Sequence, residues 1–333
     1  MQQRTIGGVR VGEIGLGCMG MSWAYGAPND EESLKVLARS LEIGVNHWDT
    51  ADLYGAGDNE KLLANALKGK REQVFLATKF GNVYDRTLTS HQDQVQKEAP
   101  WIVDGTPAYA RKCIDLSLQR LQVDHVDLYY LHRVDPQTPI EETVGAMADF
   151  VREGKVKHIG LSEAAVDTIQ RANKVHPITA VQSEFSIWTR DYEDDVVPLC
   201  AELGISFVAY SPLGRGFLTG NIRKPEDLAE DDWRRGHPRF QGENLVRNLR
   251  LVEVVEKIAT ERGVCPAQVA LAWVLMQGNH ILPIPGTKRQ QYLEENASAT
   301  NVILTSDDLI ALDEAAHAEG ARYPERALPF VNR

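Results

Sequence analysis

The sequence predicts an α/β fold, a (β/α)₈ TIM barrel with an N-terminal hairpin and a long lid loop after the seventh strand. Short apolar runs alternate with helix-length segments from residue 14 to about residue 300, which is the pattern of repeated βα units. Eight such runs can be counted, and this number favours a closed barrel over an open doubly wound sheet. No shift in composition marks a boundary, so residues 1–333 are expected to form a single domain.

The eight expected strands are short and mostly apolar. Their Val, Ile, Leu and aromatic residues suit strands that are buried on both faces of a parallel sheet. They span Glu13–Gly17, Val45–Asp49, Val74–Lys79, Val126–His132, His158–Ser162, Ala180–Ser183, Ser206–Ser211 and Ile281–Pro285.

Helix signals mark the segments between these strands. Asn29 precedes three acidic residues and Gly44 follows the last apolar position, which indicates the start and the end of a helix. Pro107 after Thr106 is typical of a first helical turn. The expected helices include Asp30–Ile43, Asn59–Leu67, Pro107–Leu121, Pro139–Glu153, Val166–Lys174 and Asp194–Leu203.

Two segments lie outside the repeat. The first alternates polar and apolar residues on both sides of Gly7-Gly8 and predicts a small hairpin that caps the floor of the barrel. The second, residues 212–248, is rich in Gly, Arg, Asp and Pro and is far longer than an ordinary βα loop. Because it leaves the chemical end of a strand, we expect it to form a lid over the site.

The composition is that of an ordinary globular protein, with 43% hydrophobic and 25% charged residues. A formal net charge of -11 argues against binding to nucleic acid or to an anionic membrane, because both need a basic face. No stretch approaches the roughly 20 apolar residues of a membrane span and the first residues do not resemble a signal peptide, so a cytoplasmic protein is expected. The four cysteines lack metal-like spacing and are expected to be reduced thiols.

Four polar residues stand at or just beyond the ends of three expected strands. Asp49, Lys79 and His132 end the second, third and fourth strands, and Tyr54 closely follows Asp49. The carboxyl ends of barrel strands meet on one face, so these side chains are expected to form one site. Tyrosine, with a free pKa of about 10, donates a proton well only beside a cation in a fixed geometry. Lys79 would supply that cation and Asp49 would hold it in place, while His132 would orient the substrate oxygen or relay its proton.

Each of these residues also has an ordinary structural interpretation. Asp49 could cap the following helix, Lys79 could be a solvated strand end, and His132 could bond a backbone carbonyl. A second alternative is a metal-dependent barrel hydrolase, with the ligands His47, Asp49, Asp52 and His132. Lys79 would add an unfavourable positive charge to such a metal site, so no metal is expected.

Stretches around these residues resemble the signature motifs of the aldo-keto reductase family. They are Asp49-Thr50-Ala51-Asp52-Leu53-Tyr54-Gly55-Ala56-Gly57-Asp58-Asn59-Glu60, Thr78-Lys79 and Leu131-His132-Arg133. Further matches follow in the same order, namely Gly160-Leu161-Ser162, Val181-Gln182, Ala209-Tyr210-Ser211-Pro212-Leu213 and Ile284-Pro285-Gly286-Thr287. The chain resembles bacterial and plant members and, more distantly, potassium-channel β subunits.

The resemblance implies an enzyme that binds NADPH, with NADH less favoured, and reduces aldehydes or ketones to alcohols. Tyr54 would then be the general acid, and Lys79 and Asp49 would be the pair that lowers its pKa. His132 would align the carbonyl group. The alternative function is that of an NADP-binding regulatory subunit, because the potassium-channel β subunits that the barrel resembles retain the same four residues.

The resemblance also assigns residues to the cofactor. Ser162 and Gln182 match positions that hold the nicotinamide carboxamide, and Tyr210 matches the aromatic residue that stacks on the nicotinamide ring. A hydroxyl, accessible backbone amides and a guanidinium suit a pyrophosphate, and they are offered by Ser211, Leu213, Gly214 and Arg215. A helix N-terminus with two adjacent cations suits the extra phosphate of NADPH, and it is formed by Gly286, Thr287, Lys288 and Arg289. The residues that match positions near the adenine are Glu295 and Asn296.

The sequence departs from the family pattern at three of these positions. Many members have Asn where this chain has Glu163, so one amide contact to the cofactor must change. Members with the best-known phosphate site have Lys at the position of Gly286 and Arg at that of Tyr292. A preference for NADP therefore depends on Lys288 and Arg289.

Aromatic residues on loops at the chemical face suggest an apolar mouth around a small-molecule carbonyl substrate. The candidates are Trp23, Tyr25, Trp101 and Trp188. The sequence does not define the substrate itself, the preferred direction of reaction or whether the protein is a monomer or a homo-oligomer, because specificity resides in loop conformation.

Overall fold

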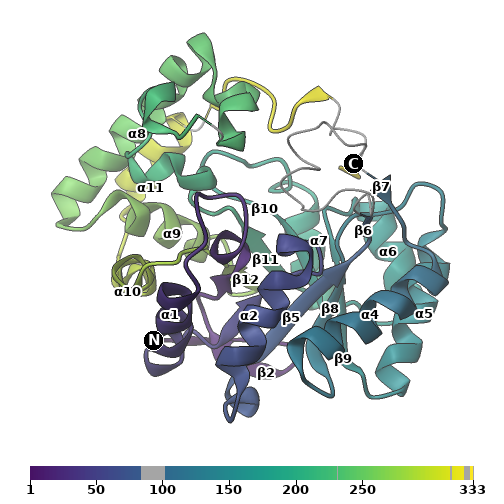
Figure 1. Cartoon of the computed structure of the whole chain (residues 1–333). Helices are drawn as coiled ribbons and strands as arrows, with labels where there is room; N and C mark the ends of the chain where they lie inside the picture. Colours follow the sequence, from purple (N-terminus) through teal and green to yellow (C-terminus); the bar gives the residue numbers. More distant parts are fainter. Residues whose placement is uncertain (84–101, 231, 316, 326–330, 333) are drawn as a thin grey trace.

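The computed structural model describes residues 1–83, 102–230, 232–315, 317–325 and 331–332. Its centre is a sheet of eight strands that curls into a barrel (Figure 1). All neighbouring strands are parallel, and in order they are β3 (Leu16–Gly17), β4 (His47–Asp49), β5 (Phe75–Phe80), β8 (Val126–Leu131), β9 (Val156–Ser162), β10 (Ala180–Glu184), β11 (Ser206–Tyr210) and β12 (Ile281–Pro283). The prediction of a parallel eight-stranded barrel is confirmed.

The barrel closes between its last strand and its first. The Gly15 amide donates to the Pro283 carbonyl oxygen at 2.9 Å, and Gly17 forms a parallel bridge with Gly286. A Cβ atom on Gly17 would lie 2.8 Å from the carbonyl oxygen of Ile284, so this seam has room only for glycine. The first expected strand is shorter than predicted because its early residues follow directly on the N-terminal hairpin.

Helices surround the barrel and connect its strands (Figure 1). Those that match expected helices are α1 (Asp30–Glu42), α2 (Asp58–Leu67), α4 (Pro107–Leu121), α5 (Ile140–Arg152), α6 (Val166–Val175) and α7 (Val196–Leu203). The side chain of Asn29 accepts a hydrogen bond from the Glu32 amide, and that of Thr106 accepts one from the Tyr109 amide, as expected of N-caps. The second half of the chain adds α8 (Gly242–Arg262), α9 (Pro266–Met276), α10 (Gln290–Ser298) and α11 (Ser306–Ala315).

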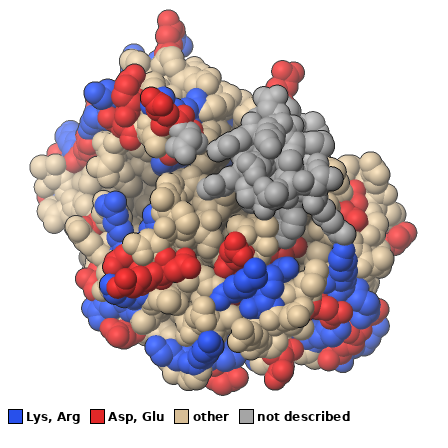
Figure 2. All heavy atoms as spheres, in the orientation of Figure 1, with Lys and Arg blue, Asp and Glu red and all other residues tan. Residues whose placement is uncertain are grey.

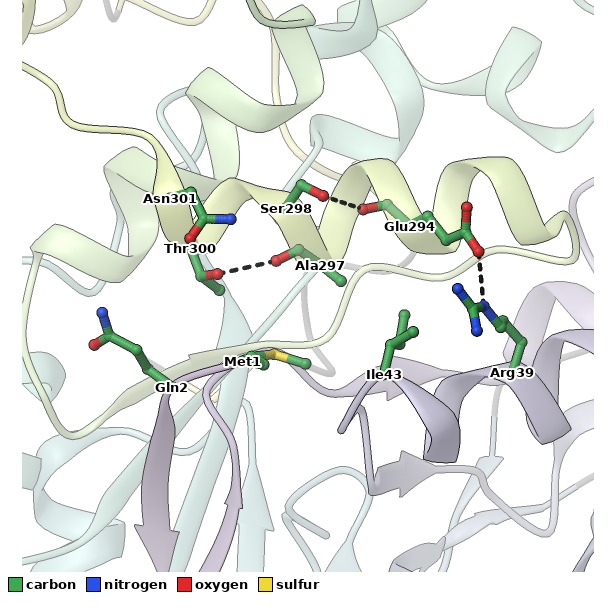
Figure 3. Close-up of a pocket in the computed structure, with 9 residues that line it drawn as sticks. All are labelled: Met1, Gln2, Arg39, Ile43, Glu294, Ala297, Ser298, Thr300 and Asn301. Atoms are coloured by element: carbon green, nitrogen blue, oxygen red, sulfur yellow. Dashed lines mark hydrogen bonds and ion pairs between the residues drawn. The ribbon is translucent and has the colours of Figure 1, made fainter.

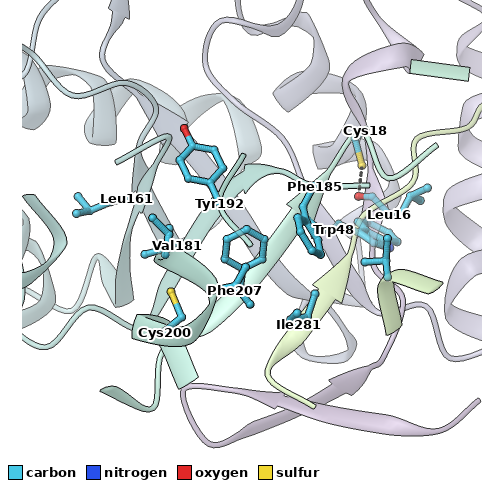
Figure 4. Close-up of a cluster of buried hydrophobic side chains, with 14 of the residues drawn as sticks. Leu16, Cys18, Trp48, Leu161, Val181, Phe185, Tyr192, Cys200, Phe207 and Ile281 are labelled. Atoms are coloured by element: carbon cyan, nitrogen blue, oxygen red, sulfur yellow. Dashed lines mark hydrogen bonds between the residues drawn. The ribbon is translucent and has the colours of Figure 1, made fainter. Parts of the chain in front are cut away.

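The N-terminal hairpin closes one end of the barrel. Strands β1 (Gln3–Ile6) and β2 (Val9–Gly12) pair antiparallel around Gly7-Gly8. Ile6 and Val11 join the apolar cluster inside the barrel, where they pack with Phe75 and other inward-facing strand residues. A second and larger cluster, part of which is drawn in Figure 4, fills the layer between the strands and the helices. The polar site must therefore lie at the opposite end of the barrel, beyond the carboxyl ends of the strands.

We call residues 212–248 the lid segment, and its described residues form a series of short 3-10 helices. These are η4 (Gly214–Thr219), η5 (Pro225–Asp227), η6 (Trp233–Gly236) and η7 (Pro238–Phe240), and they lead into α8. Phe217 and Phe240 of the lid segment pack against Trp188, with the Trp188 and Phe217 ring centroids 4.3 Å apart. Aromatic packing of this kind explains why a segment with so many loop-forming residues has a defined conformation.

Residues 317–325, which follow α11, form a C-terminal segment that returns to the barrel. In Figure 1 this part of the chain is yellow and crosses above the strands. Asn248 donates to the Glu319 carbonyl oxygen at 3.0 Å, and Arg239 donates to that of Gly320 at 3.2 Å. The lid segment and α8 thus hold the C-terminal segment in place.

Figure 2 shows basic and acidic residues intermixed over the face in view. In the part of the chain that the structure describes, every helix is too short or too polar to cross a membrane.

Candidate active site

The barrel brings Asp49, Tyr54, Lys79 and His132 together. Asp49 ends β4 and pairs in register with Ala77 of the neighbouring strand β5, which also carries Lys79. Tyr54 begins the short helix η2 (Tyr54–Gly57) in the loop after β4. Because these elements are adjacent, the register between β4 and β5 places the Asp49 carboxylate, the Lys79 ammonium and the Tyr54 phenol in one cluster.

The Lys79 ammonium is the centre of this cluster. It donates to Asp49 Oδ1, to the Thr50 carbonyl oxygen at 2.8 Å and to the Tyr54 hydroxyl oxygen at 3.3 Å. An ammonium has three N–H groups, and these three partners account for all of them. The Lys79 side chain has no exposed surface, and that of Asp49 is 3% exposed. The ion pair therefore fixes the direction in which Lys79 faces Tyr54.

The pKa values reflect both burial and charge. Burial raises the pKa of the Tyr54 phenol above its usual 10, and the Lys79 ammonium opposes this increase. Burial also works against the charged form of Lys79, but Asp49 and Tyr54 together raise its pKa above the usual 10.5. Lys79 therefore stays protonated. Lys79 does lower the pKa of Tyr54 as expected, but in this enclosed site the increase caused by burial is larger.

Rings surround the Tyr54 phenol on two sides. The His132 ring meets it edge-on, with centroids 5.9 Å apart and an interplanar angle of 85°. The Trp23 ring stacks on it at 6.3 Å and 25°. Tyr54 and His132 are each only 8% exposed, so both rings are largely enclosed by their neighbours.

The expected carboxamide residues lie on the strands next to this cluster. Gln182 on β10 donates through Nε2 to Asp49 Oδ2 at 2.8 Å, while the other carboxylate oxygen of Asp49 faces Lys79. The Ser162 hydroxyl, at the end of β9, accepts from the Arg133 guanidinium at 3.4 Å. Gln182 is thus bonded directly to the cluster around Lys79, whereas Ser162 is bonded to Arg133 next to His132.

Glu163 forms a contact that the sequence did not predict. Its carboxylate has no exposed surface and receives two hydrogen bonds from Arg322, at 2.9 and 2.5 Å. The hydroxyls of Tyr192 and Tyr210 each donate to it at 2.9 Å. Burial raises the pKa of this carboxyl, but Arg322 and Arg133 reverse that effect and hold it at about 2. The residue that departs from the family pattern therefore anchors the C-terminal segment beside Tyr210.

Arg215 is also turned inward. Its guanidinium donates to Glu184 Oε2 at 2.8 Å and lies 2.7 Å from His237 Nδ1. The rings of Trp233 and Tyr323 cover it, with centroids 5.1 and 4.7 Å away. In this conformation Arg215 joins the lid segment to the C-terminal segment. The structure does not place it with an open face toward a phosphate.

The expected site for the extra phosphate lies at the start of α10. Arg289 is the N-cap residue of this helix and is exposed, and Gly286 is exposed beside the closing seam of the barrel. Asn296 is buried on the same helix, whereas the Glu295 carboxylate accepts from Gln291 at 2.8 Å. Lys288 has a different role, because its ammonium faces the backbone of residues 25–27.

The expected substrate aromatics separate into different groups. Trp23 covers Tyr54, and Tyr25 packs edge-on against Trp233 of the lid segment with centroids 5.9 Å apart. Trp188 is 3% exposed and lies among lid-segment rings, so the structure places it in packing rather than at an open mouth. Trp101 lies outside the described residues.

A groove lies elsewhere on the molecule. It has a volume of about 610 Å³ and lies between the N-terminus, the end of α1 and the helix α10 (Figure 3). The ion pair of Arg39 with Glu294, at 2.7 Å, lies on its wall. Met1 and Gln2 place the groove at the hairpin end of the barrel, so it is not part of the cluster around Lys79.

Within the described ranges, no three His, Cys, Asp or Glu side chains are grouped so that they could hold a metal ion.

Comparison with known proteins agrees with the geometry. The sequence profile of the Aldo/keto reductase family matches residues 13–317. The chain belongs to the aldo/keto reductase family. The resemblance seen in the motifs is therefore confirmed, and the protein is an oxidoreductase of this family.

Individual relatives show how closely the whole chain is shared. A probable aldo-keto reductase of Glycine max is 46% identical over 321 residues, which cover 95% of this chain and 89% of the relative. An aldo-keto reductase of Schizosaccharomyces pombe, whose name includes NADP(+), is 44% identical over 332 residues, with 97% and 95% coverage. Among solved structures, a glycerol dehydrogenase of Gluconobacter oxydans is similar with a TM-score of 0.84 at 27% identity, covering 94% of each chain.

Proposed function

We propose that this protein reduces aldehydes or ketones to alcohols with NADPH and that Tyr54 is the general acid. The observation that carries the proposal is the Lys79 ammonium, which is held between Asp49 and the Tyr54 hydroxyl in an enclosed site. No solvated strand-end lysine would have this arrangement. The name of the S. pombe relative supports the choice of NADP.

The proton chemistry follows from the contacts. Tyr54 would donate its proton to the carbonyl oxygen as that oxygen gains negative charge, and Lys79 would stabilise the phenolate that remains. Asp49 keeps Lys79 charged and directed at Tyr54. His132 lies edge-on to the phenol, where a ring nitrogen can orient the carbonyl oxygen. The cofactor, when bound, supplies the hydride that reduces the carbonyl carbon.

Three residues on β9, β10 and β11 fit a nicotinamide. A hydroxyl at Ser162 and an amide at Gln182 can bond a carboxamide, and Tyr210 offers a ring whose hydroxyl is fixed by Glu163. Gln182 holds Asp49 through its amide nitrogen, which leaves its carbonyl oxygen as an acceptor for a carboxamide N–H. We infer that the lid segment, residues 212–248, closes over the phosphate portion of the cofactor and that residues 1–333 act as one domain.

A direct test mixes the purified protein with NADPH and a panel of reactive aldehydes and follows the loss of NADPH absorbance. Turnover of at least one aldehyde is expected, and absence of turnover over a broad panel would refute the proposal. Calorimetry with NADPH and with NADH, carried out in parallel, tests the cofactor preference separately. Tighter binding of NADPH is the expected result.

A further inference from the structure

The ammonium of Lys288 is bound to the loop that covers the catalytic tyrosine. It donates to the carbonyl oxygens of Tyr25, Gly26 and Ala27 at 2.8, 3.2 and 2.7 Å. These three contacts use all three N–H groups of an ammonium. Lys288 is distant in sequence from this loop, so the contacts join the start of α10 to the segment between β3 and α1.

This segment, residues 22–28, contacts both Tyr54 and the lid segment. Trp23 stacks on the Tyr54 ring, and Tyr25 packs against Trp233 and under the Arg234 guanidinium of the lid segment. Ala24 between them has a φ of 75°, a left-handed conformation that is unfavourable for a residue with a Cβ atom. The loop is therefore held in a conformation that it would not favour by itself.

The same ammonium also stands where an anion would bind. It lies just before the N-terminus of α10, next to the exposed guanidinium of Arg289. Burial and then the charge of Arg289 lower the pKa of Lys288 below its usual 10.5, so a nearby anion would relieve an unfavourable field. Because all three donors already serve the loop, a phosphate could bond Lys288 only by displacing at least one carbonyl oxygen.

We infer that Lys288 is a positioning residue that holds residues 22–28 over Tyr54, and that an adenosine 2′-phosphate loosens this loop by competing for the Lys288 ammonium. The inference rests on the proposed use of NADPH. It gives the extra phosphate a second role, because its binding would loosen the loop that carries Trp23, whose ring stacks on Tyr54.

The test measures hydrogen–deuterium exchange of the peptide that spans residues 22–28. This peptide has the same sequence in wild type, in Lys288→Ala and in the matched control Arg289→Ala. Without ligand, Lys288→Ala should exchange at least about tenfold faster than wild type, the factor expected for loss of one charge-assisted hydrogen bond. Arg289→Ala removes a neighbouring cation that does not contact the loop, so its exchange should equal that of wild type.

The ligand arm uses adenosine 2′,5′-bisphosphate, with adenosine 5′-monophosphate as the control that lacks the 2′-phosphate. The bisphosphate should speed exchange of residues 22–28 in wild type but not in Lys288→Ala, and the monophosphate should change neither. Bisphosphate that binds by calorimetry yet leaves exchange unchanged or slower would overturn the coupling alone. If the bisphosphate accelerated exchange of residues 22–28 equally in Lys288→Ala and in Arg289→Ala, the role of Lys288 would be overturned. If the bisphosphate failed to bind, the proposed phosphate site and the coupling would both be refuted.

Discussion

The buried pair formed by Glu163 and Arg322 gives a quantitative prediction. The pKa of Glu163 falls from its usual 4.5 to about 2 in the folded protein, which corresponds to roughly 3 kcal/mol in favour of the ionised carboxylate. This stabilisation is complete above about pH 4.5 and is lost as the pH falls toward 2. Replacing Arg322 by Gln leaves the carboxylate buried without its main counter-charge. We expect the free energy of unfolding at pH 7 to fall by about 3 to 5 kcal/mol.

Urea unfolding followed by circular dichroism measures this loss. The matched control is Arg171→Gln, because Arg171 also donates two hydrogen bonds to a glutamate, Glu141, but both side chains are exposed. That variant should unfold at essentially the wild-type urea concentration. The double variant Glu163→Gln/Arg322→Gln should lose less than the sum of the two single changes, because neither charge is then buried alone. If Arg322→Gln were no more costly than Arg171→Gln, the reasoning about this buried pair would be refuted.

Three further predictions concern the cluster around Lys79 and the neighbouring His47 of β4. Tyr54→Phe should lower kcat by about 10²- to 10⁴-fold and leave the Kd for NADPH unchanged; weaker cofactor binding at normal kcat would contradict the assigned role. Lys79→Met should abolish most turnover and also destabilise the fold by about 3 to 5 kcal/mol in urea, because Asp49 loses its buried partner; a stability equal to wild type would show that the pair is solvated. Burial lowers the pKa of His47 from 6.5 to about 4, so the unfolded chain binds the proton first as the pH falls. This residue should therefore cost about 2 kcal/mol of stability between pH 7 and pH 5, and unfolding of His47→Gln should depend less on pH in that range.

Much of the fold could be predicted from sequence because its elements have local signals. Helix α4 begins at Pro107 behind the Thr106 cap and ends at Leu121 as expected, since the cap, the proline and the apolar spacing are all local features. Strand β3 was predicted less well, because its ends depend on closure against β12 and on the hairpin that precedes it. No local pattern encodes such pairing.

The grouping of the candidate catalytic residues was predictable for a related reason. In a parallel barrel, a residue at the carboxyl end of a strand faces the same end of the molecule as its counterparts, so Asp49, Lys79 and His132 could be grouped before any contact was known. Which of these side chains bond to one another could not be predicted. That Lys79 lies between Asp49 and Tyr54, and that Gln182 bonds the other oxygen of Asp49, depends on rotamers that packing decides.

The sequence by itself determined the alternating βα pattern, the motifs of the family and the four candidate catalytic residues, because strand periodicity and motif spacing are properties of neighbouring residues. Only the tertiary structure decided that Arg322 returns to neutralise Glu163 and that Lys288 holds residues 25–27. Each of these contacts joins segments that are far apart in the chain. Their energy comes from burial and charge pairing, which exist only after the barrel has formed and excluded water from the site.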